Sequence, residues 1–461
     1  MILASDLNFR NFISSIRRTI KYFFYCRIWD LFLTKSQANV TLYIMLIKIE
    51  KAEKIILERI HALDIIKIDL NEAEGFCLAE EILADRDLPP TDRSAMDGFA
   101  VRADDVMNCP KQLKLIGETA AGSAECPNVE PNTCARILTG AVLPPGADAV
   151  VKVEDTEEEG DRVTILESAE VGLNIRKQGE EVRKGKIVIK SRKSLNAAQI
   201  GICASVGKRV VKVYNKPKIS VLNTGKELFP LGAGCEIKAY QIRDSNGPSL
   251  EAALKRSGFR CSKLEISPDD PQILEAKLKK LVAENDVVIL SGGVSVGKYD
   301  FVPAAIKKIG AEIHIHGVQM KPGKPFLYAT LGSNKHIFGL PGNPLSVLTG
   351  FYELVLPGLR GMSGFLKEKC YRKIFLPVGC IVKSKESRIE FHLAKLVCSE
   401  ETTFLMPIKS HGSGDLISSA EADGVFAVPA NTEIQKGEKV EFTTDNYNNN
   451  CLPCACNFLV F

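Results

Sequence analysis

The residues of greatest chemical interest begin with "VVILSGGVSVGKYDF", residues 287–301, which passes from four apolar residues into a loop with three glycines and two serines. Glycines let backbone N–H groups approach an anion closely, and the start of a following helix adds a favourable dipole. A phosphate group is the natural ligand of such a loop. The alternative is a tight strand-to-helix turn without a ligand, because the loop lacks the dinucleotide-binding spacing and has Tyr299 where a P-loop places Ser or Thr after its lysine.

Two further loops carry groups that could bind an oxyanion. "MKPGKPF" follows some twenty residues later and places Lys321 and Lys324 around a Pro-Gly turn, where two prolines stiffen the backbone. "GLPGNPLS" then places Gly342 and Asn343 at the start of a helix. Three such loops at one edge of a sheet predict an oxyanion pocket.

Acidic residues accompany the same loops: Glu227 follows "NTG", Asp269 lies in "SPDDP", and Asp300 follows the glycines. Two bare carboxylates ~4 Å apart repel by about 4 kcal/mol at an effective dielectric of 20. If these side chains converge, a cation such as Mg²⁺ is expected to bridge them to phosphate. Taken singly, each is also typical of a helix cap or a surface group, and capping is the alternative for Asp269 because it precedes a helix.

Other catalytic chemistry has less support. His314 and His316 lie two residues apart on a predicted strand, but no third ligand is in view, so packing is favoured over a metal pair. The six histidines are scattered along the sequence, so a Ser/His/Asp triad is not indicated.

The elements that position these loops form an alternating pattern. Between "KPKISVLNTG" and "LPGLRGM" strand and helix signals alternate, which predicts a parallel sheet covered by helices. Asp270 and Pro271 are expected to cap and start one of these helices. Because open α/β sheets bind ligands at the carboxyl ends of their strands, the glycine loop has the expected position for a site.

The rest of the chain suggests additional domains. "KIEKAEKIILERIHAL" predicts an amphipathic helix through Leu63, residues 110–192 are β-rich, and residues 370–442 return to strands. We therefore expect a multidomain α/β plus β fold in an elongated subunit: a central three-layer α/β domain with a mostly parallel sheet, a β-rich insertion domain and a small C-terminal β-barrel-like domain. The expected boundaries are 45–96 with 185–216 for a discontinuous linker and dimerisation domain, then 97–184, 217–364 and 365–443.

Composition narrows the possible partners. With 60 Lys+Arg against 56 Asp+Glu, the net charge of +4 is too small to indicate a nucleic-acid partner. Fourteen scattered cysteines favour reduced thiols in a cytosolic protein. Cys451, Cys454 and Cys456 have a metal-like spacing without a matching second half, so a metal site there is a weaker alternative.

The two ends of the chain are expected to lie outside the fold. Charges interrupt the apolar runs of residues 1–44 well short of the ~20 residues that a membrane span needs. We interpret this segment as an extension outside the fold or a misassigned start, with an amphipathic anchor or presequence as the alternative. Residues 444–461 are expected to be a disordered tail.

Several motifs in order give the chain a family resemblance. They are "DLPPTDRSAMDGFAVRADD", "RILTGAVLPPGADAVVKVED", "GLNIRKQGEEVRKG", "SGGVSVGKYDF", "MKPGKP" and "LPGNPLS". From about residue 46 to 442 the chain closely resembles the molybdopterin molybdenumtransferases, the bacterial molybdenum-insertion enzymes related to the E domain of gephyrin.

The resemblance implies a homodimer of elongated four-domain subunits in the cytoplasm, with the site at the subunit interface. It implies that adenylated molybdopterin and molybdate are substrates, and that the pyrophosphate is cleaved with Mg²⁺ to give molybdenum cofactor and AMP. Molybdopterin adenylyltransferase and molybdoenzyme chaperones are the implied protein partners. No membrane span and no nucleic acid are implied.

Site residues carried over by motif fall into overlapping groups. Asp97 and Thr139 would reach the site across the dimer interface and join the catalytic group, which is completed by Glu227, Asp269, Asp300, Lys321 and Lys324. Glu227, Asp269 and Asp300 would also hold the metal. The phosphates of the substrate would bind at Ser291, Gly292, Gly293, Val294, Ser295, Gly297, Gly342 and Asn343. Molybdate would contact Lys321, Lys324, Pro325, Ser346, Arg388 and Ser413.

The sequence departs from the family pattern at a few positions: Lys226, Glu181 and Gly317 replace residues that are common there, and position 393 lacks a frequent arginine. Two other functions are alternatives. A molybdopterin adenylyltransferase resembles residues 217–360, but its usual "TGGTG" is replaced here and it lacks the extra β domains. A non-catalytic, gephyrin-like scaffold or cofactor carrier would be expected to lose the acidic set, which is intact.

Overall fold

The structure, a computed structural model, describes residues 46–444 except 124, 233, 235, 296–299, 372, 400 and 401. The expectations for residues 1–44, for the C-terminal tail with its cysteines and for Gly297 lie outside these residues. Within the described part, no helix is both long enough and apolar enough to cross a membrane.

The central α/β domain is built on a six-stranded sheet in the order β16-β13-β17-β21-β20-β18. The first four strands are parallel, whereas β20 runs antiparallel to both of its neighbours. A turn of only three residues joins β20 to β21, which is too short for the crossover that parallel strands need. The strands are β13 (Ile219–Thr224), β16 (Cys261–Ser267), β17 (Val287–Ser291), β18 (Glu312–His316), β20 (Leu327–Leu331) and β21 (Lys335–Leu340).

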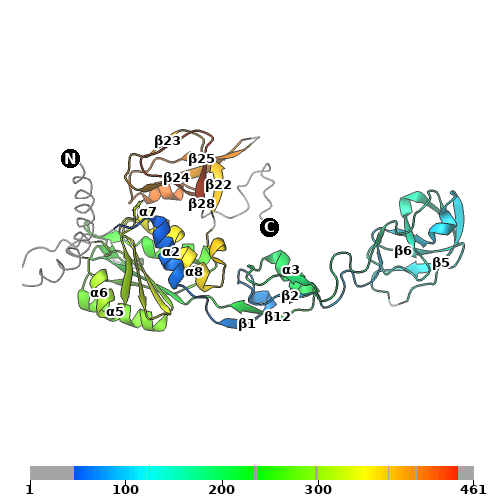
Figure 1. Ribbon diagram of the computed structural model, residues 1–461, viewed down its shortest axis with the longest axis horizontal. Coiled ribbons are helices and arrows are strands. Elements are labelled where there is room, and N and C mark those ends of the chain that lie inside the picture. The colour runs from blue at the N-terminus through cyan, green and yellow to red at the C-terminus, as the bar shows by residue number, and fades with distance from the viewer. Residues whose placement is uncertain are drawn as a thin grey trace, which may run out of the picture. The chain divides into compact units, whose positions relative to one another are not determined.

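Helices cover both faces of this sheet, which gives the predicted three layers (Figure 1). Successive residues of β17 enter two separate cores, because side chains alternate across a strand: Val287 and Ile289 pack on one face, Val288 and Leu290 on the other. α2 (Ile49–Arg59), α4 (Asn246–Arg256), α7 (Pro344–Gly350) and α8 (Leu356–Met362) contribute to the first core, and α5 (Pro271–Glu284) and α6 (Val302–Lys308) to the second.

Local helix signals are mostly confirmed. Asp270 accepts hydrogen bonds from the backbone nitrogens of Gln272 and Ile273, both over 2.9 Å, and Pro271 begins α5. The N-terminal amphipathic helix is also present, but it ends at Arg59 rather than Leu63. The chain is extended at Ile60, and Leu63 donates its backbone N–H to Met362 instead of continuing the helix.

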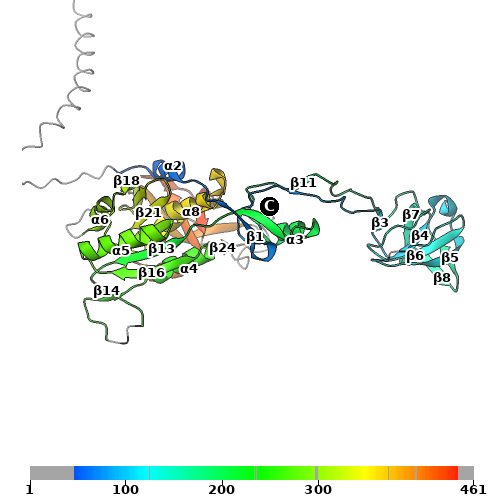
Figure 2. The ribbon, with the colours of Figure 1, turned by 90° about the horizontal axis from the view of Figure 1, so that it is seen from below.

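The β-rich module contains a six-stranded sheet in the order β7-β4-β6-β5-β9-β8, seen as one group in Figure 2. Its strands are β4 (Gly98–Val101), β5 (Lys111–Thr119), β6 (Thr133–Ile137), β7 (Ala149–Lys152), β8 (Thr156–Glu159) and β9 (Arg162–Ile165). Segments on either side of it in the sequence pair with each other. These pairs are β1 (Ile65–Asp69) with β12 (Val210–Tyr214), β2 (Ile82–Leu83) with β11 (Ile187–Ile189), and β3 (Arg93–Ser94) with β10 (Ile175–Arg176). Together with α3 (Ala197–Ser205), β1, β2, β11 and β12 form the linker module.

The C-terminal domain is a curled sheet that includes a strand from the central domain. β19 (Met320–Lys321) pairs in parallel with β24, so that Lys321 lies opposite Glu390. The sheet curls because Val378, just after β22, bridges to Leu405 of β25. The remaining elements are β22 (Lys373–Pro377), β23 (Val382–Lys383), β24 (Ile389–Cys398), β25 (Thr403–Pro407), α9 (Leu416–Ala420), β26 (Gly424–Val428), β27 (Glu433–Ile434) and β28 (Lys439–Thr444).

Candidate functional site

Loops that follow the four parallel strands meet at one edge of the central sheet. The segments after β13, β16, β17 and β21 line a cavity of about 680 Å³, which we call the glycine-loop cavity. It contains Glu227, Asp269 and Asp300 together with Ser291, Gly292, Gly293, Val294, Ser295, Gly342 and Asn343. The structure therefore brings the predicted acidic group and the described members of the predicted phosphate group to one place.

The glycines of this cavity are required by the packing of the loops themselves. Gly292 has a φ of +92°, and a Cβ there would lie 2.3 Å from the carbonyl oxygen of Thr224. A Cβ at Gly293, where φ is +62°, would lie 3.1 Å from side-chain atoms of Thr224 and Val302. A tight turn alone would need the same glycines, so the observation that favours a ligand is the cavity beside them.

The acidic residues differ in how they are held. Asp269 accepts hydrogen bonds from Thr224 Oγ1 over 2.8 Å and from the backbone nitrogen of Lys226 over 3.1 Å. The cap of α5 is Asp270, so the capping interpretation of Asp269 is wrong. In the described part of the chain no three His, Cys, Asp or Glu side chains form a ready metal cage. Mg²⁺ commonly binds one or two protein carboxylates together with substrate phosphates. The three carboxylates beside the glycine loop fit this mode of binding.

Two polar groups of this cavity were missed by the sequence reasoning. Asn246, at the start of α4, donates to the carbonyl oxygen of Gly342 over 2.7 Å and to Ser291 Oγ over 3.0 Å. Its Oδ1 is buried and finds no hydrogen-bond partner among the described residues. The buried carboxylate of Asp244 accepts from Asn223 Nδ2 over 2.8 Å. The available signal was the polar run "DSNG", which includes both residues.

A second cavity, of about 640 Å³, lies between the central domain and the C-terminal domain, and we call it the lysine cavity. The predicted molybdate group lines it in full: Lys321, Lys324, Pro325, Ser346, Arg388 and Ser413. Pro325, Pro341 and Asn343 line both cavities, so the two adjoin.

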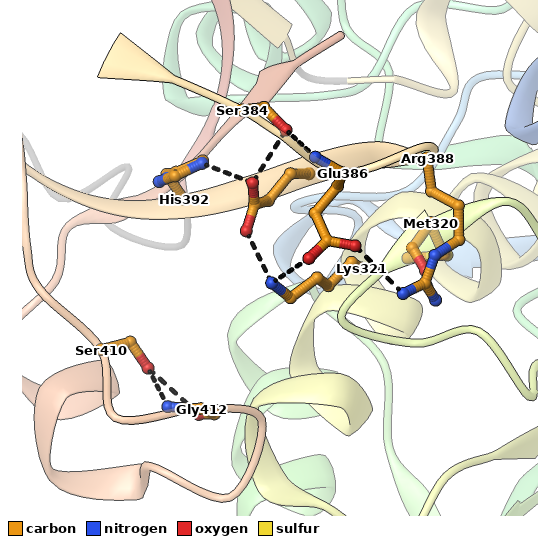
Figure 3. Close-up of polar contacts among 9 residues, drawn as sticks. Met320, Lys321, Ser384, Glu386, Arg388, His392, Ser410 and Gly412 are labelled. Carbon is orange, nitrogen blue, oxygen red and sulfur yellow. Dashed lines mark hydrogen bonds and ion pairs between the residues drawn. The ribbon is translucent and has the colours of Figure 1, made fainter. Parts of the chain in front are cut away.

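Two glutamates hold Lys321, and the sequence reasoning missed both (Figure 3). Lys321 Nζ donates to Glu386 Oε1 over 2.9 Å and to Glu390 Oε1 over 3.0 Å. The hydrogen bond from Lys321 lowers the pKa of Glu386, and the bonds to both glutamates raise the pKa of Lys321. Arg388 also contacts Glu386, with 3.4 Å between Nη2 and Oε2. Both glutamates lie in the segment "KESRIE", from which the family resemblance assigned only Arg388 to the site.

Glu390 is held more firmly than Glu386. Its Oε2 accepts from Ser384 Oγ over 2.9 Å and lies 3.4 Å from His392 Nε2. Burial raises the pKa of Glu390, but the hydrogen bonds from Lys321 and Ser384 outweigh it, so that the pKa is lowered overall. Glu390 is therefore a fixed carboxylate in the wall of the lysine cavity.

Asp97 and Thr139 form hydrogen bonds with each other. Thr139 donates to Asp97 Oδ1 from its backbone nitrogen over 2.6 Å and from its hydroxyl over 2.7 Å. These bonds lower the pKa of Asp97. Neither residue lines the glycine-loop cavity or the lysine cavity of its own chain, as far as the structure describes them. An approach from a second subunit stays a prediction.

The histidine pair on β18 has protein partners. His314 Nε2 lies 2.8 Å from Thr330 Oγ1, and His316 Nε2 lies 3.0 Å from the carbonyl oxygen of Val294. These contacts give both rings a packing role, and through Val294 the second ring also supports the glycine loop.

Comparison with known proteins gives matches along almost all of the described chain. Family models match residues 47–207 as "MoeA N-terminal region (domain I and II)", residues 220–361 as "Probable molybdopterin binding domain" and residues 376–444 as "MoeA C-terminal region (domain IV)". The molybdopterin molybdenumtransferase of a Nostoc species is 36% identical over 383 residues, 81% of this chain and 87% of that protein. The enzyme of the same name from Staphylococcus epidermidis is 33% identical over 391 residues, 84% of this chain and 92% of that protein.

Solved structures agree with these matches. The crystal structure of the molybdopterin biosynthesis moeA protein from Pyrococcus horikoshii OT3 is 29% identical with a TM-score of 0.73, and the match covers 87% of this chain and all of that one. The fold, the order of the family regions and the relatives above 30% identity agree, and the chain belongs to the molybdopterin molybdenumtransferase family.

Proposed function

We propose that this protein inserts molybdenum into molybdopterin during molybdenum cofactor biosynthesis. The observation that carries the proposal is the shared wall of the two cavities, where Pro325, Pro341 and Asn343 face both. A phosphorylated substrate in the glycine-loop cavity would thus lie next to an oxyanion in the lysine cavity. Proximity of two bound reactants is a large part of what an enzyme can supply.

The lysine cavity has the charge that a molybdate ion requires. Lys321, Lys324, Arg388 and Lys409 line it, while Glu390 is the carboxylate in the lining. Ser346 and Ser413 add hydroxyl groups that can donate to oxyanion oxygens. We assign molybdate to this cavity and the diphosphate of adenylated molybdopterin to the glycine-loop cavity.

Mg²⁺ is part of the same proposal. Glu227, Asp269 and Asp300 would hold it against the substrate phosphates, where it would neutralise charge on the departing phosphate. The chain's own contribution is to orient the carboxylates, and the bonds from Thr224 and Lys226 fix Asp269 for this purpose.

A cytoplasmic homodimer completes the proposal. The linker module exposes large apolar side chains that a monomer would leave in water, among them Ile65, Leu83, Ile187, Ile202 and Val210. An isologous contact through this module would bury them. It would also offer a route by which Asp97 and Thr139 of one subunit reach the cavities of the other.

The test is AMP release from adenylated molybdopterin by the purified protein, with and without molybdate and Mg²⁺. Release that needs both would support molybdenum insertion. Tight substrate binding without release under any condition would favour the scaffold or carrier alternative. Formation of adenylated molybdopterin from ATP and molybdopterin would favour the adenylyltransferase alternative.

A further inference from the structure

We propose that Glu386 determines the anion selectivity of the lysine cavity, because its carboxylate occupies Lys321 and Arg388 until a doubly charged oxyanion displaces it. The identity of that oxyanion rests on the proposed function. The competition itself rests on side chains that the structure describes.

The carboxylate of Glu386 bridges the two cations with separate oxygens. Its Oε1 accepts from Lys321 Nζ over 2.9 Å, and its Oε2 lies 3.4 Å from Arg388 Nη2 (Figure 3). A tetrahedral oxyanion placed between the same two cations would make the same pair of charge-assisted contacts. Glu386 therefore acts as an internal substitute for the anion, and the two cannot use both cations at once.

The surroundings of Glu386 allow this exchange. Its side chain is 33% exposed, and Glu386 lies within the short connection between β23 and β24. Its backbone is fixed independently, because its carbonyl oxygen accepts from the nitrogen of Asn431 over 3.0 Å and its own nitrogen donates to Ser384 Oγ over 3.2 Å. The carboxylate can therefore leave the cations by side-chain rotation alone.

Glu390 cannot make the same movement. Its side chain is 17% exposed, it lies within β24, and Lys321, Ser384 and His392 surround its two oxygens. It keeps Lys321 in place when Glu386 departs. We therefore assign Glu390 as a positioning residue for Lys321 and Glu386 as the competitor.

The charge of an anion determines whether it can displace the Glu386 carboxylate from Lys321 and Arg388. A monoanion that replaces the Glu386 carboxylate exchanges one negative charge for another and gains little. A dianion brings an additional charge beside Lys324, which lines the same cavity. Discrimination by an internal repulsive or competing group is a general way to build specificity.

The experiment measures molybdate binding to the full chain by titration calorimetry, with increasing chloride at constant ionic strength kept by a bulky organic anion. Glu386→Gln keeps the size of the side chain and removes its charge. We expect molybdate to bind about two- to fivefold more tightly to this variant, the range that partly exposed ion pairs contribute. We also expect chloride to compete with molybdate more strongly than it does in the wild type. Unchanged or weaker molybdate binding, or unchanged chloride competition, would overturn the proposal.

Matched variants separate this effect from general damage. Glu433→Gln removes the carboxylate of an ion pair with Lys383 in the same domain and should bind like the wild type, because Lys383, unlike Lys321 and Arg388, does not line the cavity. Glu390→Gln should weaken molybdate binding, because Lys321 loses its fixed partner. If Glu386→Gln does not fold, Glu386→Asp provides the test, since the shorter side chain keeps the charge but reaches the two cations less well and should give a smaller shift in the same direction.

Failure of the proposed function would look different. If the wild type binds molybdate or sulfate but releases no AMP, and Glu386→Gln still shifts binding, the selectivity proposal stands and molybdenum insertion falls. If AMP release is normal and Glu386→Gln binds molybdate like the wild type, molybdenum insertion stands and the selectivity proposal falls. If neither protein binds any divalent oxyanion, the selectivity proposal falls as well.

Discussion

Asn343 Nδ2 donates to Ser413 Oγ over 2.6 Å, and this bond joins the central domain to the C-terminal domain at the edge of the lysine cavity. A second bond supports the first, because the backbone nitrogen of Leu345 donates to the carbonyl oxygen of Ser413 over 3.1 Å. Asn343 also lines the glycine-loop cavity. One loop contact thus aligns the walls of both cavities.

Ser413→Ala should weaken this alignment without unfolding the protein. A single hydrogen bond contributes about 0.5–1.5 kcal/mol, so we expect the KM for molybdate to rise by about two- to tenfold in the AMP-release assay. The thermal midpoint should hardly change, because the bond to Asn343 is exposed. Ser399→Ala is the control, since Ser399 makes an exposed hydrogen bond within a turn, to the carbonyl oxygen of Thr402, and does not line the cavity. Equal kinetic effects in the two variants would contradict the alignment role.

Gly292→Ala should distort the loop that lines the glycine-loop cavity. The added Cβ would meet the carbonyl oxygen of Thr224 at 2.3 Å, and the φ of +92° is itself unfavourable for alanine. We expect a destabilisation of about 1–3 kcal/mol and at least a tenfold loss of AMP release. Gly201→Ala is the matched substitution, because Gly201 lies inside α3 with no atom within 4 Å of the new Cβ. That variant should gain about 0.5–1 kcal/mol of unfolding free energy. Similar losses in both would show that the loop geometry is not the cause.

Two neighbouring aspartates should respond differently to the same change. Asp269→Asn removes a carboxylate from the glycine-loop cavity, so we expect AMP release to fall by about two orders of magnitude and to need more Mg²⁺. Asp270→Asn should retain both activity and stability, because asparagine caps a helix as well as aspartate does. Asp300→Asn is expected to behave like Asp269→Asn. Retained activity at the usual Mg²⁺ concentration in Asp269→Asn would remove this residue from the metal group.

The sequence was sufficient to place the loops of both cavities, for a physical reason. Periodic apolar runs identify β17 and its neighbours, and parallel strands put their carboxyl ends at one edge. The partner of Lys321 was not predictable in this way. β19 is only two residues long, and its register with Glu390 arises from a sheet that spans two domains.

The roles of two adjacent aspartates were predictable only in part. Pro271 at the first helical position indicated Asp270 as the cap of α5, which the structure confirms, whereas the hydrogen bond from Thr224 to Asp269 depends on a contact between distant segments. The sequence held one weak indication that the edge of the central sheet is antiparallel. The three-residue connection between β20 and β21 is too short for the crossover that joins parallel strands.

A partly buried charge cluster between the central domain and the C-terminal domain supplies a prediction about pH. Lys373 Nζ lies 3.6 Å from Glu53 Oε1, 3.7 Å from Glu353 Oε2 and 3.3 Å from Glu441 Oε1. One ammonium group thus faces three carboxylates that come from α2, from the π-helix η4 (Phe351–Val355) and from β28. Burial raises the pKa of Glu53 to about 7 and also raises the pKa of Glu353.

Glu53→Gln should therefore change how stability depends on pH. Between pH 4.5 and about 7 the folded protein holds a proton on Glu53 that the unfolded chain releases, so this group stabilises the fold at low pH and loses that contribution as the pH rises. We expect the difference in unfolding free energy between wild type and variant to shift in favour of the variant across this range, by an amount on the order of 1–3 kcal/mol. Buried His336, whose pKa is lowered to about 4, acts in the opposite direction in both proteins, so only the difference between them isolates Glu53. Denaturant titrations at several pH values measure it, with Glu50→Gln on the exposed side of α2 as the control. A constant difference across the range would show that Glu53 is ionised in the folded protein, and Lys373 would then neutralise it fully despite the two competing carboxylates.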